Sequence, residues 1–315
     1  MALHGLAHLT LGVPDVAAAS AFYDDFGLEP TGGGRFASSD GGEQLALVHR
    51  PVRALVEYAC AADDRDDIDR IRAAATSHGI ATRDEGDDLV MNEPVVGMSV
   101  RITTRPRIVQ SPVTVEPINA PGIRARGSER APGIFARDGA TPRRLGHALY
   151  TTPDMAASQS FLNDVLGFRT SDVVPGIISF NRCSTDHHNI GLINAPVPFF
   201  HHSSWQVDDT DAIGHGAHKL LAVDPKRNAW GLGRHFLGSN YFWYFRDPAG
   251  HMAEYFADLD QIDDAEWTTG TWEPDKSLYS WGPPVPPDFV MPPDIEELSA
   301  AYAASSAAQA SKESS

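Results

Sequence analysis

The sequence contains an internal repeat, and this limits the chain to folds in which similar units follow one another. The segment HLTLGVPDVAAASAFYDDFGLEP, starting at His8, matches HALYTTPDMAASQSFLNDVLGFRTSD, starting at His147. Each copy has a histidine, an alternating run, Pro-Asp, small residues, a central Phe and a closing Gly. The alternation predicts a strand, the Pro-Asp pair places Asp15 or Asp154 near a helix start, and the glycine predicts a helix end.

A second pair of matching segments follows the first. LVEYACAADDRDDIDRIRAAATSHGI, ending at Ile80, parallels HSSWQVDDTDAIGHGAHKLLA, beginning at His202. Both predict a strand, an Asp-Asp turn and a helix with apolar residues at helical spacing. Each half is therefore expected to be a tandem of units in which a strand and a helix precede further strands.

Composition suggests where the halves begin and end. We expect an N-terminal domain over residues 1–120, a Gly-, Arg- and Pro-rich linker over 121–142 and a C-terminal domain over 143–262. Residues 263–315 are first Trp- and Pro-rich and then Ala- and Ser-rich. This composition predicts an arm that wraps the C-terminal half, followed by a disordered tail.

The charge balance argues against two classes of partner. Asp and Glu number 42 against 25 Lys and Arg, so the surface field should repel nucleic acids and anionic membranes. The longest apolar runs fall well short of the roughly 20 residues that a membrane span requires. Only Cys60 and Cys183 are present, which predicts no disulfide framework and favours the cytoplasm.

The two halves differ where chemistry would be expected. At the position of His202 the first half has Glu57, in the register set by the Asp-Asp turns, although a slip of one residue would substitute Val56 or Tyr58. No clear acidic residue in the first half corresponds to Glu254. We infer that the N-terminal half keeps the scaffold and lacks a metal.

Histidines are concentrated at strand-like positions of the second half. Any single one is more often an ordinary hydrogen-bonding residue. Together with Glu254, two of them would supply the neutral imidazoles and the carboxylate that hold Fe(II) with open positions for substrate and dioxygen. A structural zinc site is disfavoured because close cysteine pairs are absent. The candidates are His147, His187, His188, His201, His202 and His235.

The stretch GLGRHFLGSNYFWYFRDPAGHMAEYF, from Gly231 to Phe256, resembles the signature of the type I extradiol ring-cleavage dioxygenases of the vicinal oxygen chelate superfamily. In that pattern a histidine is followed by Tyr, Asp-Pro, Gly and a metal-binding Glu. Trp243 departs from it, since the family usually has an aliphatic residue or Phe there. The resemblance extends from about His8 to Trp281. It implies an α+β fold of two tandem domains, each of paired βαβββ modules that form a funnel-like mixed sheet.

The resemblance also implies a site. RLGHALYTTPD and FFHHSSWQVDD look like the segments that carry the two metal histidines, so His147, His202 and Glu254 are the expected ligands. DHHNIGL implies His188 as the acid–base residue, ahead of its neighbour His187. His235 and Tyr244 match residues that hydrogen-bond the bound substrate and oxygen.

The implied reaction is cleavage of a catechol ring next to the diol by O2, giving a hydroxymuconic semialdehyde or ketone. Fe(II) is the expected metal and Mn(II) the alternative, because relatives use either with the same ligands. Relatives are commonly multimeric, so a homo-oligomer is expected.

The pocket is expected to accept a catechol with a neutral or apolar substituent. Relatives that cleave acidic catechols have an Arg where this chain has Trp230, and the basic pair they carry before the Trp-Gly of the arm is replaced by residues 277–280, SLYS. A buried substrate carboxylate would therefore lack its partner. Phe180, Trp230 and Asn240 are the expected pocket residues.

Two other activities remain open on the same scaffold. One is another vicinal oxygen chelate enzyme of the glyoxalase, epimerase or thiol transferase type. The other is a binding protein of the bleomycin-sequestering kind, which needs no metal. Oxygen uptake with catechol separates ring cleavage from both.

Overall fold

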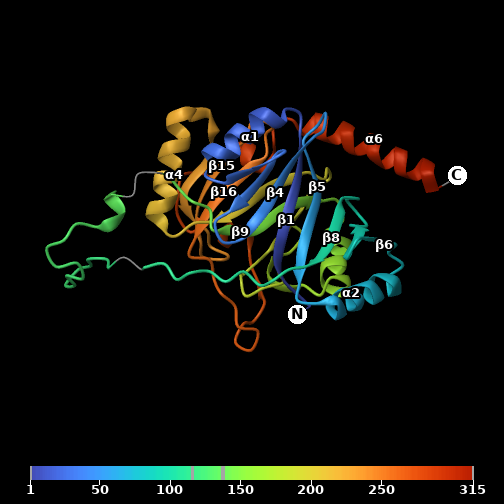
Figure 1. The fold of residues 1–315 in the computed structure, drawn as a ribbon, viewed down its shortest axis with the longest axis horizontal. Coiled ribbons are helices and arrows are strands. Elements are labelled where there is room, and N and C mark those ends of the chain that lie inside the picture. Colours follow the sequence, from blue (N-terminus) through green and yellow to red (C-terminus); the bar gives the residue numbers. More distant parts are fainter. Residues whose placement is uncertain (1, 115–116, 136–138, 314–315) are drawn as a thin grey trace.

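A computed structural model describes residues 2–114, 117–135 and 139–313. The chain forms two large mixed sheets, one in each half, and strands of the two sheets contact each other (Figure 1). Among the residues that the structure describes, no helix is long and apolar enough to cross a membrane.

The first sheet contains two βαβββ modules, as the family resemblance implied, and each begins with the strand and helix that the repeat predicted. The first is β1 (Leu3–Val13), α1 (Val16–Asp25), β2 (Glu29–Gly32), β3 (Arg35–Ser38) and β4 (Gly42–His49). The second is β5 (Ala54–Ala62), α2 (Arg65–Ser77), β6 (Thr82–Glu85), β7 (Asp88–Asn92) and β8 (Ser99–Thr104). The strand order is β2-β3-β4-β1-β5-β8-β7-β6, with β1 and β5 antiparallel at the centre.

The second sheet repeats this arrangement. Its first module is β9 (Arg144–Thr152), α3 (Met155–Ser160) with a following π turn (Phe161–Val165), β10 (Arg169–Val174), β11 (Ile178–Arg182) and β12 (Ile190–Asn194). Its second is β13 (Phe200–Gln206), α4 (Thr210–Val223), β14 (Asn228–Arg234), β15 (Tyr241–Arg246) and β16 (Met252–Ala257). The order is β14-β15-β16-β13-β9-β12-β11-β10-β17, where the edge strand β17 (Gly270–Thr271) comes from the arm.

An aspartate begins the helix of every module. The side chains of Asp15, Asp64, Asp154 and Asp209 each accept a hydrogen bond from the backbone N–H three residues later. This bond satisfies one of the donors that a helix start leaves free, and an Asp at this position typically contributes ~1 kcal/mol. The Pro-Asp and Asp-Asp turns of the sequence are therefore the four helix starts.

Aromatic packing joins the two halves. The ring of Phe26 in the first half stacks on Tyr255 of β16, with centroids 4.1 Å apart, and the Tyr255 hydroxyl donates to the Phe26 carbonyl. Both side chains are fully buried. The sheet that carries β16 is thus held directly against the first half.

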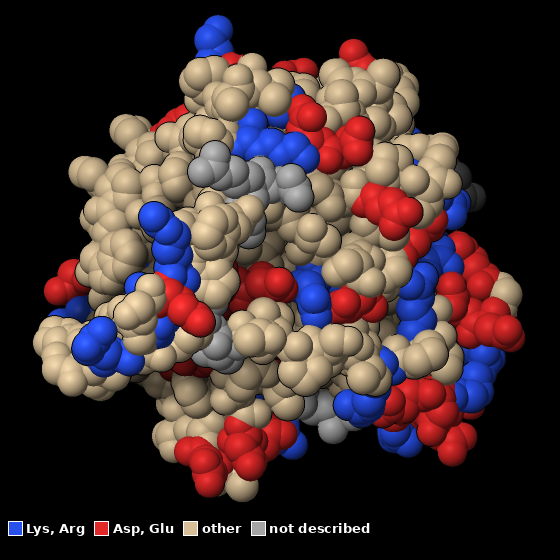
Figure 2. All heavy atoms as spheres, turned by 60° about the vertical axis from the view of Figure 1, so that its left-hand side comes forward, with Lys and Arg blue, Asp and Glu red and all other residues tan. Residues whose placement is uncertain are grey.

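The connection between the sheets runs from Thr104 to Arg144, and much of it projects away from the body (Figure 1). It contains a short 3-10 helix, Pro132–Phe135. On the face drawn in Figure 2, acidic and basic side chains of the described residues are interspersed, without a continuous basic band.

The segment after β16 adds β17 to the edge of the second sheet and then returns to the first half, where Asp294 pairs with Arg53. It contains short helices at Pro274–Lys276 and α5 (Pro287–Val290), and then α6 (Ile295–Glu313). A helix therefore stands where the sequence predicted disorder. Alanine has the highest helix propensity, and Glu296 and Glu297 in the first turn favour the helix dipole.

Candidate metal centre

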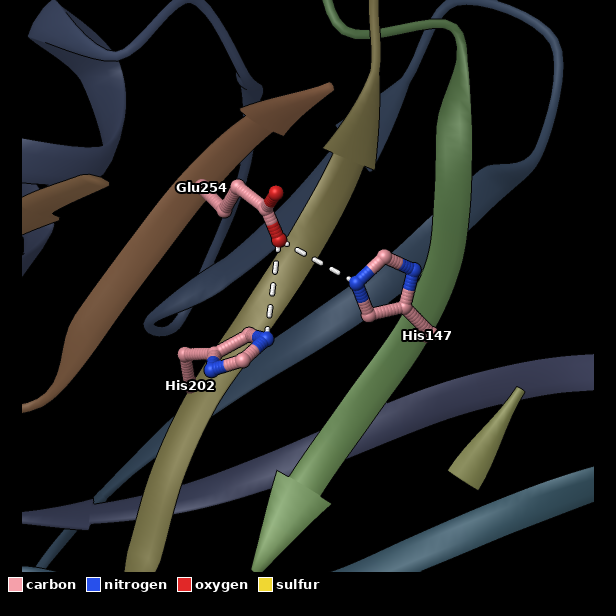
Figure 3. A group of neighbouring side chains, drawn as sticks. All are labelled: His147, His202 and Glu254. Atoms are coloured by element: carbon pink, nitrogen blue, oxygen red, sulfur yellow. Dashed lines mark hydrogen bonds and ion pairs between the residues drawn. The ribbon is translucent and has the colours of Figure 1, made fainter. Parts of the chain in front are cut away.

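Three adjacent strands bring His147, His202 and Glu254 together (Figure 3). His147 on β9 pairs with Ser204 on β13, and Ser204 pairs with Glu254 on β16. His202 precedes Ser204 by two residues. Because successive side chains alternate between the faces of a sheet, all three project from the same face. The three expected ligands therefore converge, although they are far apart in the sequence.

The distances between these side chains fit a divalent ion. Glu254 Oε2 lies 3.1 Å from His147 Nε2 and 3.5 Å from His202 Nε2, and the three possible ligand atoms lie within 4.8 Å of one another. An ion about 2.1 Å from each of two ligands at right angles would separate them by about 3 Å. His202 Nε2 is buried and has no hydrogen-bond partner among the described residues. A bound cation would provide that partner.

The protonation states also suit a cation. Burial alone would raise the pKa of Glu254, but the neighbouring His147, His235 and His202 outweigh it and hold the pKa well below its usual range. Burial, followed by the nearby His201, lowers the pKa of His202 well below its usual value. Near neutral pH the site therefore offers a carboxylate and a neutral imidazole, the forms that bind a metal.

A hydrogen-bond chain distinguishes His202 from its neighbour His201. His201 Nε2 lies 2.9 Å from the carbonyl oxygen of Phe289, which can only accept, so His201 donates there. Burial lowers the pKa of His201 to about 4, and its neutral ring must accept at Nδ1. His202 Nδ1, 2.7 Å away, is then the donor. His202 consequently presents an Nε2 without hydrogen toward Glu254.

The other expected catalytic residues surround this cluster. The ring of His188 lies 4.1 Å from that of His147, centroid to centroid. His235 Nδ1 is bonded to the Leu278 carbonyl, so its Nε2, 2.8 Å from the Tyr244 hydroxyl, accepts from Tyr244. Burial, followed by the charge of Glu254, raises the pKa of Tyr244 well above its usual value. The phenol therefore stays a hydrogen-bond donor.

An apolar cavity of about 240 Å³ opens beside the candidate ligands. Phe180 lines it, as expected, but Trp230 and Asn240 do not belong to its lining. Trp230 lies behind the wall, packs on Phe289 and donates to the Pro283 carbonyl. Asn240 donates to Glu254 Oε1 at 3.2 Å. The lining consists of His147, Leu149, Ile177, Ile178, Phe180, His188, Ile193, His201, His202, His235, Leu237, Tyr244, Pro274, Ser277, Leu278, Phe289 and Val290.

The first half lets the same positions be compared without the candidate ligands. In the second half His202 pairs with Leu149, two residues beyond His147. In the first half Glu57 pairs with Thr10, two residues beyond His8, the histidine that corresponds to His147 in the repeat. The strand register therefore puts Glu57 at the place of His202, in agreement with the register of the sequence.

The same register identifies the counterpart of Glu254. In the second half Glu254 pairs with Ser204, two residues after His202. In the first half Ala59, two residues after Glu57, pairs with Arg101, so Arg101 is the counterpart of Glu254. Sequence comparison did not find this residue, because the first half lacks the Asp-Pro turn that marks Glu254. The sequence signal for Arg101 was limited to a basic residue between the apolar residues Val100 and Ile102 of a strand.

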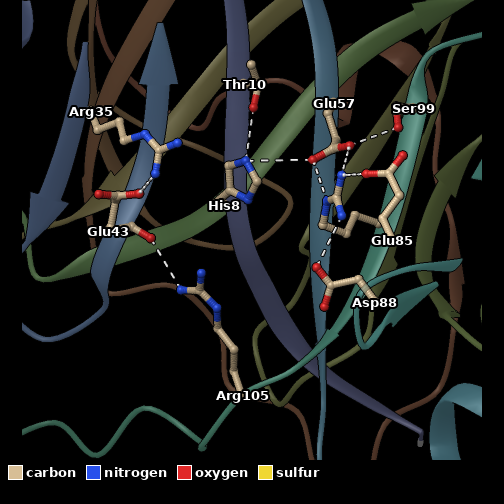
Figure 4. Close-up of polar contacts among 10 residues, drawn as sticks. His8, Thr10, Arg35, Glu43, Glu57, Glu85, Asp88, Ser99 and Arg105 are labelled. Carbon is tan, nitrogen blue, oxygen red and sulfur yellow. Dashed lines mark hydrogen bonds and ion pairs between the residues drawn. The ribbon is translucent and has the colours of Figure 1, made fainter. Parts of the chain in front are cut away.

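Arg101 forms ion pairs with Glu57, Glu85 and Asp88, three of the carboxylates that Figure 4 labels. Its Nε and Nη2 lie 2.9 and 3.1 Å from the carboxylate oxygens of Glu57, and it also contacts Glu85 and Asp88. His8 Nε2 is 3.9 Å from Glu57. The guanidinium of Arg101 thus supplies, in the first half, the positive charge that a metal ion would supply in the second. Among the described residues, His147, His202 and Glu254 form the one group that could hold a metal.

Comparisons with known proteins show the family of this chain. The model of the Glyoxalase/Bleomycin resistance protein/Dioxygenase superfamily matches residues 144–255. Metapyrocatechase 2 from Cupriavidus necator is 33% identical over 299 residues, which cover 92% of each chain.

Two solved structures share the fold. The Mn(II)-bound glyoxalase from Novosphingobium aromaticivorans has a TM-score of 0.74 and 25% identity, over 91% of this chain and 93% of that one. An extradiol ring-cleaving dioxygenase from B. fuscum also has a TM-score of 0.74, with 22% identity over 91% and 81%.

Proposed function

Because this chain belongs to the extradiol dioxygenase family within the glyoxalase and dioxygenase superfamily, we propose that it cleaves the ring of a catechol beside its diol, using both atoms of O2. The observation that carries the proposal is the convergence of His147, His202 and Glu254 at the wall of an apolar cavity.

His147, His202 and Glu254 would hold a single divalent ion, with Fe(II) favoured. Two neutral imidazoles and one carboxylate on one side are the ligand set of non-haem Fe(II) oxygenases. Mn(II) is the alternative, since the structurally similar glyoxalase is Mn(II)-bound. The ion would supply a Lewis acid for the diol and a route for electrons to dioxygen.

His188 is the proposed acid–base residue. It lines the cavity, and burial, followed by the nearby imidazoles, lowers its pKa well below the usual value. Its neutral ring can therefore accept a proton from a diol hydroxyl and return it later in the reaction. Tyr244 and His235, which are hydrogen-bonded to each other and also line the cavity, would orient the substrate and oxygen.

The cavity favours a catechol with a neutral or apolar substituent. Its described lining contains no Lys or Arg and includes Leu149, Ile178, Ile193 and Leu237. An ionised carboxylate placed there would lose its hydration without gaining a partner. Methylcatechol or dihydroxybiphenyl should therefore be preferred over arylacetate or benzoate diols. A tenfold preference in the opposite direction would show this specificity to be wrong.

Oxygen consumption tests the activity itself. Iron-loaded protein mixed anaerobically with catechol and then with air should take up oxygen and form a yellow ring-cleavage product. A glyoxalase-type enzyme, favoured by the likeness to the Mn(II)-bound glyoxalase, or a binding protein would do neither. Loading the same preparation with Mn(II) compares the two metals directly.

The setting of the enzyme is also a proposal. We propose a cytoplasmic homo-oligomer. Cys60 and Cys183 are both buried free thiols, which suits a reducing compartment. Light scattering on the purified protein measures the oligomeric state, and a mass equal to that of one chain would contradict this part.

A further inference from the structure

Behind His188 lies a second histidine that the proposed reaction does not use. His187 is fully buried. Its Nδ1 is 3.0 Å from Nδ1 of His188, and its Nε2 is 2.8 Å from Oδ2 of Asp172. The three side chains therefore form a continuous hydrogen-bonded row from a buried carboxylate to the cavity.

Asp172 is fixed as the acceptor at the end of this row. Its Oδ1 accepts from the Gly270 N–H at 2.8 Å and from Trp272 Nε1 at 2.9 Å. Its Oδ2 is left to accept from His187. These bonds tie the carboxylate to the edge strand β17 and to Trp272, the residue that follows it.

The direction of donation then follows along the row. A carboxylate only accepts, so His187 donates from Nε2, and the uncharged form of its ring then accepts at Nδ1. His188 therefore carries its hydrogen on Nδ1. Its Nε2, which no described residue hydrogen-bonds, is left without hydrogen on a ring that lines the cavity.

We propose that Asp172 and His187 are positioning residues that hold His188, whose ring lines the cavity, in the tautomer whose Nε2 can accept a proton. This inference rests on the proposed role of His188. In the proton transfer, a diol O–H bond breaks and an Nε2–H bond forms on His188. The resulting positive charge is stabilised by the Asp172 carboxylate through His187. When the proton returns to an oxygen of the substrate, both rings are neutral again.

The other histidine pair has the same geometry with a different end. His201 bonds Nδ1 to Nδ1 with His202, but its Nε2 donates to the neutral carbonyl of Phe289. A metal ligand stays neutral and needs only the right tautomer. A proton acceptor becomes cationic. Of the two rows, the one behind His188 has a carboxylate at its far end, whereas the one behind His202 has a neutral carbonyl. The carboxylate of Asp172 thus lies behind the proposed proton acceptor His188, and the neutral carbonyl of Phe289 lies behind the proposed metal ligand His202.

Asp172→Asn tests the row with little change in shape. The amide oxygen can keep the bonds from Gly270 and Trp272, which places the NH2 against His187 Nε2. His187 would then donate from Nδ1, and His188 would carry its hydrogen on Nε2, where it blocks proton acceptance. We expect kcat for catechol to fall about 100-fold, within the range of general acid–base effects, while KM and bound iron stay close to wild type.

Two variants of His187 form a matched pair. In His187→Gln the amide can donate to Asp172 and accept from His188, so kcat should remain within about fivefold of wild type. His187→Leu can do neither, and kcat should fall about 100-fold. Equal activity of the two variants, or full activity of Asp172→Asn, would overturn the proposal.

A spectroscopic measurement separates this proposal from the proposed function. In ¹⁵N-histidine NMR of the zinc-loaded protein, His188 should carry its hydrogen on Nδ1 in wild type and on Nε2 in Asp172→Asn. Hydrogen on Nε2 in wild type refutes the row even if the protein cleaves catechol. The predicted tautomers in a protein without oxygen uptake would instead support the row and refute the activity.

Discussion

The buried carboxyl of Asp247 should make the stability of the protein fall as pH rises. Asp247 lies in the turn between β15 and β16, the strand that carries Glu254, and is 4% exposed. Burial raises its pKa from 3.8 to about 7, against the lowering effect of N–H donors from His251, Ala249 and Gly250. The folded protein therefore prefers the protonated form.

The sign and size follow from linkage. Because the folded pKa is raised, Asp247 contributes stability that is complete below about pH 4 and is lost as the pH rises to about 7. A difference of about 3 units corresponds to ~4 kcal/mol. Asp247→Asn should keep the acceptor for the N–H groups of Ala249 and His251, and it cannot ionise.

Urea denaturation of the metal-free protein at pH 4.5 and pH 8 measures the effect. The free energies of unfolding of Asp247→Asn and wild type should differ by only ~1 kcal/mol at pH 4.5. At pH 8 the variant should be more stable by up to ~4 kcal/mol. A difference between the two proteins that is the same at both pH values would refute the reasoning, and so would a variant that is less stable at pH 8.

Three further predictions concern the site and its first-half counterpart. His201→Phe should weaken metal affinity about 10- to 100-fold in chelator competition, because it removes the acceptor for His202 Nδ1. His201→Gln can still accept from His202 and should retain the affinity, so equal losses in the two variants would contradict the tautomer argument. Ile177→Arg, at the exposed edge of the cavity, should raise kcat/KM for an arylacetate diol relative to methylcatechol about tenfold, and an unchanged ratio would contradict the assigned pocket. Arg101→Met should lower the free energy of unfolding by ~1–3 kcal/mol because it leaves Glu57 without the guanidinium that pairs with it. Adding Glu57→Gln should recover most of this loss, and catechol turnover should not change in either variant.

Much of the fold was predictable because its signals are local. The Pro-Asp and Asp-Asp turns are helix caps whose partners lie three residues away, so sequence alone locates them. The repeat then identifies the modules. The C-terminal helix α6 was not predicted, because low hydrophobicity suggests disorder whereas Ala and Glu also favour helix.

The candidate ligands were predictable from motif and repeat, but the surrounding contacts were not. His187 and His188 are adjacent, and only the partners at Asp172 and in the cavity distinguish their places. These contacts join residues far apart in the chain. Arg101 was missed for a similar reason, since its equivalence to Glu254 becomes visible only in the pairing of the strands.

The metal content of Glu254→Ala tests the central claim most directly. After loading with Fe(II) and removal of free metal, the wild-type protein should hold one ion per chain, and the variant should hold almost none and lose oxygen uptake with catechol. Arg101→Met, treated identically, should bind as much iron as wild type. Full iron occupancy and turnover in Glu254→Ala would contradict the site described for this enzyme.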